Sequence, residues 1–338
     1  MVYGILVVIL VTYALYRLVL SFLDVTPDVR GKTVFISGCD SGFGHDLALK
    51  CLQHGMTVFA GCLTDEGARN LQTKASGTNE KSGESSSSRH GKLHTIIVDV
   101  ASDESVENAR KEVTSLLNGN GLDGIVNNAG VPAGGLDDWL TVKDYQKVLD
   151  VNLLGVIRTT HAFRKLVKKN KGRIVNVSSA LSMVALGTLA QYSVSKFAVK
   201  AYTDAIRTEY AQFGVTVSVL EPGFFRTPLA APAENVQRLK KLVSNLHSEV
   251  REEYGEEYFE KTIGKTQGFL DGLCSPKTYL VVDAYFHALT SKYPRVKYHV
   301  GWDYYLFFFL SLWPAVARDY LQYFAAWISG VPKPKGAR

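Results

Sequence analysis

Short, nearly continuous apolar runs alternate with longer amphipathic stretches between Lys32 and Pro228. A strand that is apolar on both faces is typical of a parallel sheet covered by helices on each side. The intervening stretches repeat their apolar residues every three or four positions, which is the period of a helix. The expected strands are Thr33–Ser37, Thr57–Gly61, Leu93–Asp99, Gly124–Asn127, Gly172–Ser178 and Thr216–Glu221.

The expected helices lie between these strands, at Gly44–His54, Glu104–Leu117, Val142–Asn170 and Val194–Phe213. Because crossovers between parallel strands are right-handed, this alternation predicts an α/β protein with a doubly wound parallel sheet, the Rossmann fold. The alternation fades after Pro228, where helices are expected at Glu234–Tyr258 and Tyr279–Thr290. This late region belongs to neither the sheet nor a cofactor turn, so we expect it to determine substrate specificity.

The chain begins with an apolar run, from Gly4 to Phe22, about as long as a helix that crosses a membrane. The run lacks the basic segment and the cleavage site of a signal peptide. We therefore expect an uncleaved, single-pass anchor over residues 1–25. Arg30 and Lys32 follow the run, which favours a cytoplasmic catalytic domain by the positive-inside tendency.

A second apolar segment, Tyr304–Trp327, is interrupted by Pro314, Arg318 and Asp319. These interruptions favour a broken or interfacial helix at a membrane surface over a simple spanning helix. A helix hairpin that closes the substrate pocket is the alternative. The predicted organisation is thus an anchor, a Rossmann domain at residues 30–295, and a C-terminal membrane-associated segment with a basic tail at residues 296–338.

The composition limits the kind of protein this can be. Of 338 residues, 46% are hydrophobic and 21% charged, which favours a folded core over disorder. The net charge of +6 is too mild to indicate nucleic-acid binding but suits an anionic membrane surface. Cys39, Cys51, Cys62 and Cys274 form no C-x-x-C pair, so we expect no metal site and no disulfide framework. The serine-rich stretch Gly77–Gly91 is expected to be a surface loop.

A glycine-rich turn follows the first strand, and its strand–turn–helix context indicates a dinucleotide site. Gly38 permits a tight turn, and Gly42 lets the backbone approach a pyrophosphate. Gly44 allows the helix to pack closely on the strand. The helix that begins here would direct its N-terminus at the phosphates, with Ser41 and Phe43 also beside the cofactor.

The type of dinucleotide depends on the acidic and basic residues near its adenosine. The second strand ends in Gly61, Cys62 and Leu63, without the acidic residue that usually binds the ribose hydroxyls. Asp40 is the nearest candidate, and its charge would repel a 2′-phosphate, which favours NAD over NADP. Arg69 and Lys74 lie further on and weaken that inference. Asp99 is placed to accept a hydrogen bond from the adenine amino group, or to cap the third strand.

Tyr192 and Lys196 are spaced one helical turn apart. The spacing puts a phenol and an ammonium on the same face of a helix. A nearby cation favours the phenolate, so we expect Lys196 to lower the pKa of Tyr192. The phenol would then serve as a general acid and base near neutral pH.

Together these motifs resemble the short-chain dehydrogenase/reductase family over residues 31–228. The motifs that carry the resemblance are Gly38, Gly42 and Gly44, the run Asn127-Asn128-Ala129-Gly130, Asn152, Ser179, Tyr192 with Lys196, and Pro222-Gly223. The sequence from Gly38 to Gly44 is similar to the retinol dehydrogenase and 17β-hydroxysteroid dehydrogenase branch. So are Tyr293–Arg295 and Gly301–Asp303. Members of that branch are mostly membrane-bound and NAD-linked.

The resemblance implies specific roles. Tyr192 would be the general base in oxidation, and Lys196 would also hold the nicotinamide ribose. Ser179 would orient the substrate oxygen, with Ser178 as its rival for that role. Asn152 would anchor a water molecule that relays protons to Lys196. The other implied cofactor contacts are Asn127, Ala129, Gly130, Pro222, Gly223 and Thr227, the last at the nicotinamide amide.

The sequence therefore predicts a membrane-anchored NAD-dependent alcohol dehydrogenase for a lipophilic substrate, with retinol or a hydroxysteroid as the favoured class. Membrane lipid is an expected partner, the endoplasmic reticulum is the expected compartment, and a homodimer could form through Val142–Asn170 and Val194–Phe213. The alternatives are an NADP-linked reductase, a small hydroxy-acid dehydrogenase, and a catalytically weak NAD-binding scaffold at a membrane. The complete set of motifs argues against a scaffold, which needs no proton relay.

Overall fold

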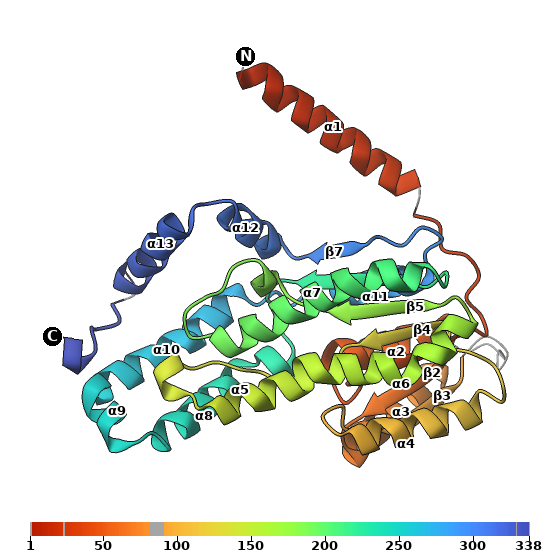
Figure 1. Cartoon of the computed structure of the whole chain (residues 1–338), viewed down its shortest axis with the longest axis horizontal. Coiled ribbons are helices and arrows are strands. Elements are labelled where there is room, and N and C mark those ends of the chain that lie inside the picture. Colours follow the sequence, from red (N-terminus) through yellow and green to blue (C-terminus); the bar gives the residue numbers. More distant parts are fainter. Residues whose placement is uncertain (1, 23, 81–90, 329, 338) are drawn as a thin grey trace.

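The core of the computed structural model is a seven-stranded parallel sheet in the order β3-β2-β1-β4-β5-β6-β7 (Figure 1). The structure describes the chain apart from residues 1, 23, 81–90, 329 and 338. The strands are β1 (Thr33–Ser37), β2 (Thr57–Cys62), β3 (Leu93–Ile97), β4 (Gly124–Asn127), β5 (Arg173–Val177), β6 (Thr216–Pro222) and β7 (Lys297–Val300). The strand order reverses between β1 and β4, where such sheets open a crevice at the carboxyl ends of their strands.

Helices cover both faces of this sheet, as the apolar strands require. One face carries α2 (Gly42–Gln53), α3 (Asp65–Glu80) and α11 (Tyr279–Thr290), and the other carries α4 (Asp103–Leu116), α6 (Gly155–Lys169) and α7 (Ala190–Ala211). Phe35 of β1 stacks on Phe163 of α6 with ring centroids 4.4 Å apart. The two apolar layers confirm the predicted doubly wound fold.

Some elements differ from the prediction. Strand β7 was not predicted, because Lys297 and His299 interrupt the apolar pattern of this four-residue edge strand. Strand β3 was expected to end at Asp99 but ends at Ile97, since Oδ1 of Asp99 accepts a hydrogen bond from the Ala101 amide and turns the chain. The stretch Gly77–Gly91 was expected to be a loop, yet its first residues, to Glu80, extend α3, and residues 81–90 lie outside the described part.

Two predicted helices are interrupted. The stretch Val142–Asn170 contains α5 (Val142–Leu149), a π-helical turn (Asp150–Leu154) and α6. The stretch Glu234–Tyr258 falls across α8 (Pro232–Ser244), α9 (Ser248–Tyr254) and the start of α10 (Glu256–Leu273), and Gly255 ends α9 with a φ of 81°. The short 3₁₀ turns are Asp137–Trp139, Ala180–Ser182, Pro228–Ala230 and Lys335–Ala337.

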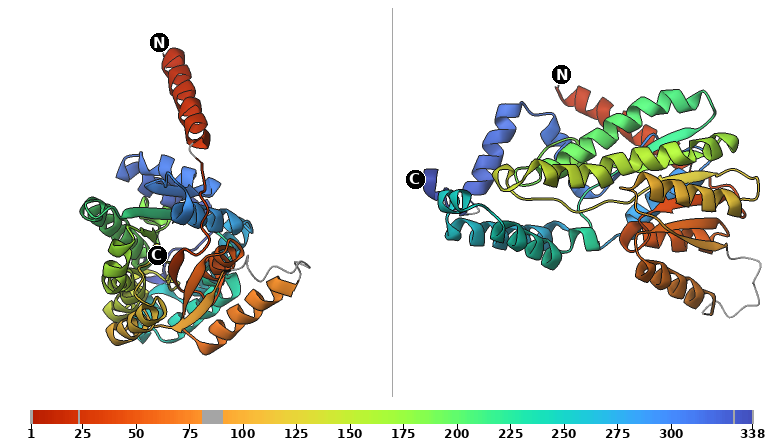
Figure 2. Two further views of the ribbon diagram at one scale, coloured as in Figure 1. Left: turned by 90° about the vertical axis from the view of Figure 1, so that its right-hand side faces the viewer. Right: turned by 60° about the horizontal axis from the view of Figure 1, so that its bottom comes forward.

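The apolar ends of the chain form separate helices. Helix α1 (Val2–Phe22) extends away from the sheet domain in Figure 1 and in the left view of Figure 2. The C-terminal segment forms α12 (Trp302–Ser311) and α13 (Ala315–Ile328), which confirms the predicted break at Pro314. Among the described residues, no helix combines the length and the apolarity that crossing a membrane requires. The anchor at residues 1–25 and the domain boundaries therefore stay predictions.

Candidate active site

A cavity of about 1450 Å³ opens at the carboxyl ends of the strands. The glycine turn between β1 and α2 forms one end of it, and α7, α8, α10 and α13 form much of the rest. Gln322 and Tyr323 of α13 are among the residues that line it, so the C-terminal segment helps to close the cavity. This agrees with the alternative in which the segment covers a pocket, although α13 has no buried residue and Tyr323 itself is 72% exposed.

The glycine turn has the geometry that its spacing predicts. Gly38 has a φ of 72°, and a Cβ placed on it would lie 2.7 Å from the Cα of Ala129. A Cβ on Gly44 would lie 2.3 Å from the carbonyl oxygen of Gly38, so the helix can approach the strand only because this residue has no side chain. Helix α2 begins at Gly42, and Ser41, Gly42 and Phe43 line the cavity beside its N-terminus. These residues fit a pyrophosphate bound at the helix end.

The carboxylate of Asp40 lies at the carboxyl end of β2. It accepts hydrogen bonds from the amide of Leu63 at 2.8 Å and from the amide of Thr64 at 3.0 Å. Gly67 permits this approach, because a Cβ there would lie 2.4 Å from Oδ1 of Asp40. The glycine turn thus places the Asp40 carboxylate at the carboxyl end of β2, where β2 itself has no acidic residue. Neither Arg69 nor Lys74 is among the residues that line the described cavity.

The residues after β3 and β4 divide between the cavity and the core. Asp99 lines the cavity, and its hydrogen bond with Ala101 shows that it also caps the strand. The side chain of Asn127 is buried away from the cavity, where it donates to Thr160 and Asn176. Asn127 was expected to contact the cofactor, but its amide instead links β4 to β5 and α6.

The neighbour of Asn127 was not singled out for its side chain, yet it shapes the glycine turn. Nδ2 of Asn128 donates to the carbonyl oxygens of Ser37 and Gly38 at 3.1 and 3.0 Å. Its Oδ1 accepts from the hydroxyl of Tyr285 on α11. The only sequence signal for this role was its place in the Asn-Asn-Ala-Gly run.

Residues at the end of β6 and after it form the other wall of the cavity at its cofactor end. Ala129, Gly130, Pro222, Gly223 and Thr227 all line the cavity, as expected. A Cβ on Gly223 would lie 2.0 Å from the carboxylate of Asp303, which accepts a hydrogen bond from the amide of Phe224. The C-terminal helix α12 therefore supports the cofactor wall through Asp303, a contact that sequence reasoning missed.

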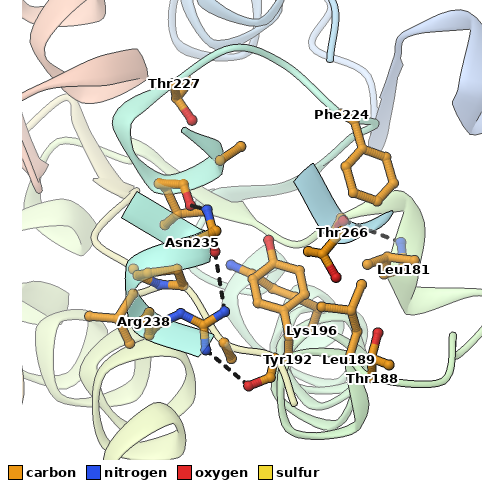
Figure 3. Close-up of a pocket in the computed structure, with 18 of the residues that line it drawn as sticks. Leu181, Thr188, Leu189, Tyr192, Lys196, Phe224, Thr227, Asn235, Arg238 and Thr266 are labelled. Carbon is orange, nitrogen blue, oxygen red and sulfur yellow. Dashed lines mark hydrogen bonds between the residues drawn. The ribbon is translucent and has the colours of Figure 1, made fainter. Parts of the chain in front are cut away.

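Tyr192 and Lys196 meet on α7 in the middle of the cavity (Figure 3). Nζ of Lys196 lies 5.5 Å from the centre of the Tyr192 ring and donates to the carbonyl oxygen of Val177 at 3.1 Å. Burial raises the pKa of Tyr192 to about 12, and a hydrogen bond with Ser179 opposes that rise. Burial also lowers the pKa of Lys196 to about 8.

In the protein alone the pKa of Tyr192 is therefore raised, and not lowered as the spacing to Lys196 led us to expect. Burial disfavours the phenolate more than the hydrogen bond with Ser179 favours it, and burial also disfavours the Lys196 ammonium. Tyr192 is held as the neutral phenol at pH 7, hydrogen-bonded to Ser179.

The two serines after β5 have different surroundings. The hydroxyl of Ser178 donates to the carbonyl oxygen of Lys196 at 2.7 Å and is buried with it. The hydroxyl of Ser179 has a longer bond of 3.4 Å to Pro222 and is the partner of Tyr192. Both serines line the cavity, but the Ser178 hydroxyl holds α7 against the sheet, whereas the Ser179 hydroxyl is the one bonded to the phenol.

Asn152 lies in the π-helical turn, which is a common feature of functional sites. Its Oδ1 accepts from the Val131 amide at 2.8 Å, and its Nδ2 donates to the Val131 carbonyl and to Ser195. Ser195 precedes Lys196 on α7. Asn152 therefore links the loop after β4 to the helix that carries the Tyr192–Lys196 pair.

Comparisons with known proteins agree with this geometry. A family model described as short chain dehydrogenase matches residues 32–238. Retinol dehydrogenase 7 of Mus musculus is 38% identical over 304 residues, which cover 90% of this chain and 91% of the relative. The 17-beta-hydroxysteroid dehydrogenase type 6 of Bos taurus is also 38% identical, over 88% of this chain and 90% of the relative.

Solved structures support the fold alone. A short-chain dehydrogenase from Streptomyces avermitilis has 21% sequence identity and a TM-score of 0.64, over 89% of this chain and 98% of that one. A short chain dehydrogenase/reductase from Burkholderia phymatum, solved in complex with NAD, has 23% identity and a TM-score of 0.63, over 80% and 90%.

Proposed function

Because the chain belongs to the short-chain dehydrogenase family, we propose that it transfers a hydride between NAD(H) and a lipophilic alcohol, with retinol or a hydroxysteroid as the favoured substrate class. The observation that carries the proposal is the meeting of the Tyr192 phenol, Ser179 hydroxyl and Lys196 ammonium in one cavity with the glycine turn. Family membership makes the chain an oxidoreductase that uses NAD or NADP.

The preference for NAD rests on the adenosine end of the cavity. Asp40 and Asp99 are the charged residues there, and the residues that line it near Leu63 and Thr64 include no cation. A 2′-phosphate would face the Asp40 carboxylate without a basic partner. The free 2′-hydroxyl of NAD could instead donate a hydrogen bond to that carboxylate.

When bound, the cofactor supplies the hydride acceptor or donor. Gly38, Ser41 and Gly42 would hold the pyrophosphate at the start of α2, and Thr227 would contact the nicotinamide amide. Ser179 would donate a hydrogen bond to the substrate oxygen, and Tyr192 would exchange the proton with that oxygen.

The pKa of Tyr192 bears on the direction in which it transfers a proton. Tyr192 is already the protonated acid that reduction of a carbonyl requires. In the oxidation direction it must first lose its proton, and the Lys196 ammonium is in position to favour that loss. Asn152, through Ser195, would position the helix that carries both groups.

The substrate class follows from the apolar part of the cavity and from the relatives. Leu181, Leu186, Leu189 and Phe224 line the cavity around Tyr192. An alcohol with a large apolar body would bury these surfaces. The relatives at 38% identity carry the names of retinol and hydroxysteroid dehydrogenases.

Membrane attachment is part of the proposal. Helix α1 exposes apolar side chains such as Val11 and Leu15, and α13 exposes Phe324 and Trp327. Such surfaces suit contact with lipid, from which an apolar substrate could enter. We keep the endoplasmic reticulum and a cytoplasmic active site as the expected arrangement. If washing membranes with high salt, without detergent, released the full-length protein, the attachment would be disproved.

A homodimer is proposed through the outer surfaces of α5, the π-helical turn, α6 and α7. Leu154, Val194 and Phe197 are exposed there, with 39%, 49% and 41% of their surfaces accessible. Burial of such a surface against a second copy would be favourable. Size determination in detergent would test this.

NADH formation by the purified, detergent-solubilised protein tests the function. The panel is a retinol, a 17β-hydroxysteroid, a 3α-hydroxysteroid and 3-hydroxybutyrate, each with NAD and with NADP. Turnover of a retinoid or steroid with NAD supports the proposal. Turnover of 3-hydroxybutyrate alone, or only with NADP, would contradict the substrate or cofactor assignment. Binding of NAD without turnover of any alcohol would favour a scaffold.

A further inference from the structure

The substrate side of the cavity holds a guanidinium that the proposed reaction does not use. Arg238 lies on α8 and lines the cavity together with Tyr192, as Figure 3 shows. One terminal nitrogen donates to the carbonyl oxygen of Gly134 at 2.9 Å, and the other donates to Oδ1 of Asn235 at 3.2 Å. Both acceptors are neutral groups, so neither compensates the positive charge of the guanidinium.

Within the part of the chain that the structure describes, Arg238 forms no ion pair with an acidic residue, and its Nε is buried without a hydrogen-bond acceptor. The side chain of Arg238 is half-buried, and this burial lowers its pKa. A buried cation normally has an anion beside it, because removal of a charge from water is costly.

The cavity wall provides a fixed seat for this cation. Asn235 holds the guanidinium with its Oδ1, and its own Nδ2 is fixed by the carbonyl oxygens of Leu229 and Ala231. Gly134 leaves room, since a Cβ there would lie 3.1 Å from an Arg238 nitrogen. The donor is thus aligned before any ligand binds, which lowers the cost of binding.

Charges of opposite sign are separated along the cavity. The acidic residues that line it, Asp40 and Asp99, belong to the adenosine end. Arg238 and Lys265 lie on α8 and α10, and Nζ of Lys265 is also buried without a hydrogen-bond partner within the described chain. Because the cofactor turn lies at the other end, the cations on α8 and α10 line the end of the cavity where the substrate would bind.

We propose that Arg238 binds a carboxylate of the substrate, so that the preferred alcohol is an apolar hydroxy acid. This rests on the proposed alcohol dehydrogenase function and narrows its substrate class. The planar guanidinium offers its free N–H groups to the two oxygens of a carboxylate, while the hydroxyl of the substrate reaches Ser179 and Tyr192. The apolar body between them packs on the leucines of the cavity.

The experiment compares each acid with its methyl ester, which removes the charge and keeps the shape. The test pair is 3α-hydroxycholanic acid and its ester, and 3-hydroxybutyric acid and its ester form a second pair that lacks the large apolar body. For the wild type we expect kcat/KM to favour 3α-hydroxycholanic acid over its ester by about tenfold to a hundredfold. Arg238→Gln should reduce that ratio to about one, and Arg238→Lys should keep part of it.

Lys240→Gln is the matched control, since Lys240 is an exposed cation of the same helix outside this cavity. It should leave the acid-to-ester ratio unchanged. Lys265→Met shows whether the second cation shares the carboxylate. A wild-type ratio near one, or a ratio that Arg238→Gln does not change, would overturn the inference and leave the proposed function standing.

A binding measurement distinguishes a failure of the proposed function from a failure of the carboxylate site. Calorimetric titration of each acid and ester into the wild type and Arg238→Gln needs no turnover. If no alcohol is oxidised but the acid binds the wild type more tightly than the ester, and Arg238→Gln removes the difference, the proposed function fails and the carboxylate site stands. Equal binding of acid and ester to the wild type overturns the site.

Discussion

Asp40 and Thr64 meet at the carboxyl end of β2, where Oδ1 of Asp40 accepts hydrogen bonds from both the amide and the hydroxyl of Thr64, at 3.0 and 2.9 Å. The acidic group at this strand end therefore comes from the glycine turn after β1, and it lies in the cavity beside Leu63. One carboxylate thus both fixes the loop after β2 and sets the charge at the adenosine end.

Replacement of Asp40 by Asn should ease the use of NADP. The amide keeps the size of the side chain and one acceptor oxygen for Thr64, but it removes the charge that opposes a 2′-phosphate. We expect kcat/KM with NADP, relative to NAD, to rise roughly tenfold, since a nearby like charge costs about 1 to 2 kcal/mol at a partly solvated site. The two coenzymes are compared with one alcohol.

Arg69→Gln is the control for that comparison, because Arg69 lies outside the described cavity wall. It should leave the coenzyme ratio unaltered. An Asp40→Asn protein that folds normally and keeps the wild-type preference would show that the carboxylate only fixes the loop.

Ser178→Ala and Ser179→Ala should differ in their effect on activity. Ser178→Ala removes the buried 2.7 Å bond to the Lys196 carbonyl, so we expect a loss of about 1 kcal/mol in unfolding free energy and most activity retained. Ser179→Ala removes the donor beside Tyr192 and should lower kcat by roughly 10²-fold. It also removes the bonds of the hydroxyl with the Pro222 carbonyl and the Leu181 amide, so a stability loss of about 1 kcal/mol is expected here too. Steady-state rates therefore distinguish the two variants, and urea unfolding measures the stability that each one loses. The reverse pattern would assign the substrate contact to Ser178.

Glu221 of β6 forms a buried polar cluster behind the site. Its carboxylate is fully buried and lies 3.0 Å from Nζ of Lys200 and 3.3 Å from Nε2 of His299. It also accepts from the hydroxyls of Ser182 and Tyr304, at 3.0 and 3.4 Å. The cluster thereby joins α7, the turn after Ser179, β7 and α12.

Because of this cluster, the free energy of unfolding depends on pH. Burial alone would raise the pKa of Glu221, but the hydrogen bonds from His299 and Lys200 and the charge of Lys200 lower it to about 2. A carboxylate whose pKa falls on folding stabilises the protein above its unfolded pKa of about 4.3. That contribution, about 3 kcal/mol, is lost as the pH falls from this value to about 2.

Glu221→Gln should therefore lower the unfolding free energy at pH 7 and make less difference at pH 3. Unfolding in urea at both pH values measures the two differences. Glu107→Gln is the control, because Glu107 forms an exposed ion pair with Arg110 and should have a much smaller effect. A Glu221→Gln effect that is the same at pH 7 and pH 3 would contradict the lowered pKa.

The local motifs of this chain could be predicted from sequence because each is confined to one strand–turn–helix unit. The positions of Gly38 and Gly44 follow from spacing alone, and the structure shows the close contacts that spacing implies. The apolar strands likewise predicted that helices cover both faces of the sheet, since a parallel sheet must be buried on both faces.

Contacts between distant segments were beyond the sequence pattern. Nothing local indicates that Asp303 supports Gly223, or that Arg238 lies beside Gly134. The pKa of Tyr192 was predicted with the wrong sign because the spacing to Lys196 reveals the cation but not the burial of both groups. Asn127 was misplaced since its neighbour Asn128, and not Asn127, faces the glycine turn.

The most direct test of the account is turnover and NAD binding by Tyr192→Phe, with Tyr202→Phe as the control. Tyr202 is a half-buried tyrosine of the same helix that packs in the core away from the cavity. We predict that Tyr192→Phe loses NADH formation from the best alcohol of the panel by at least about 10³-fold while its NAD affinity stays within about threefold. Tyr202→Phe should keep both. A Tyr192→Phe protein that still oxidises the alcohol at a rate near the wild type would contradict the account.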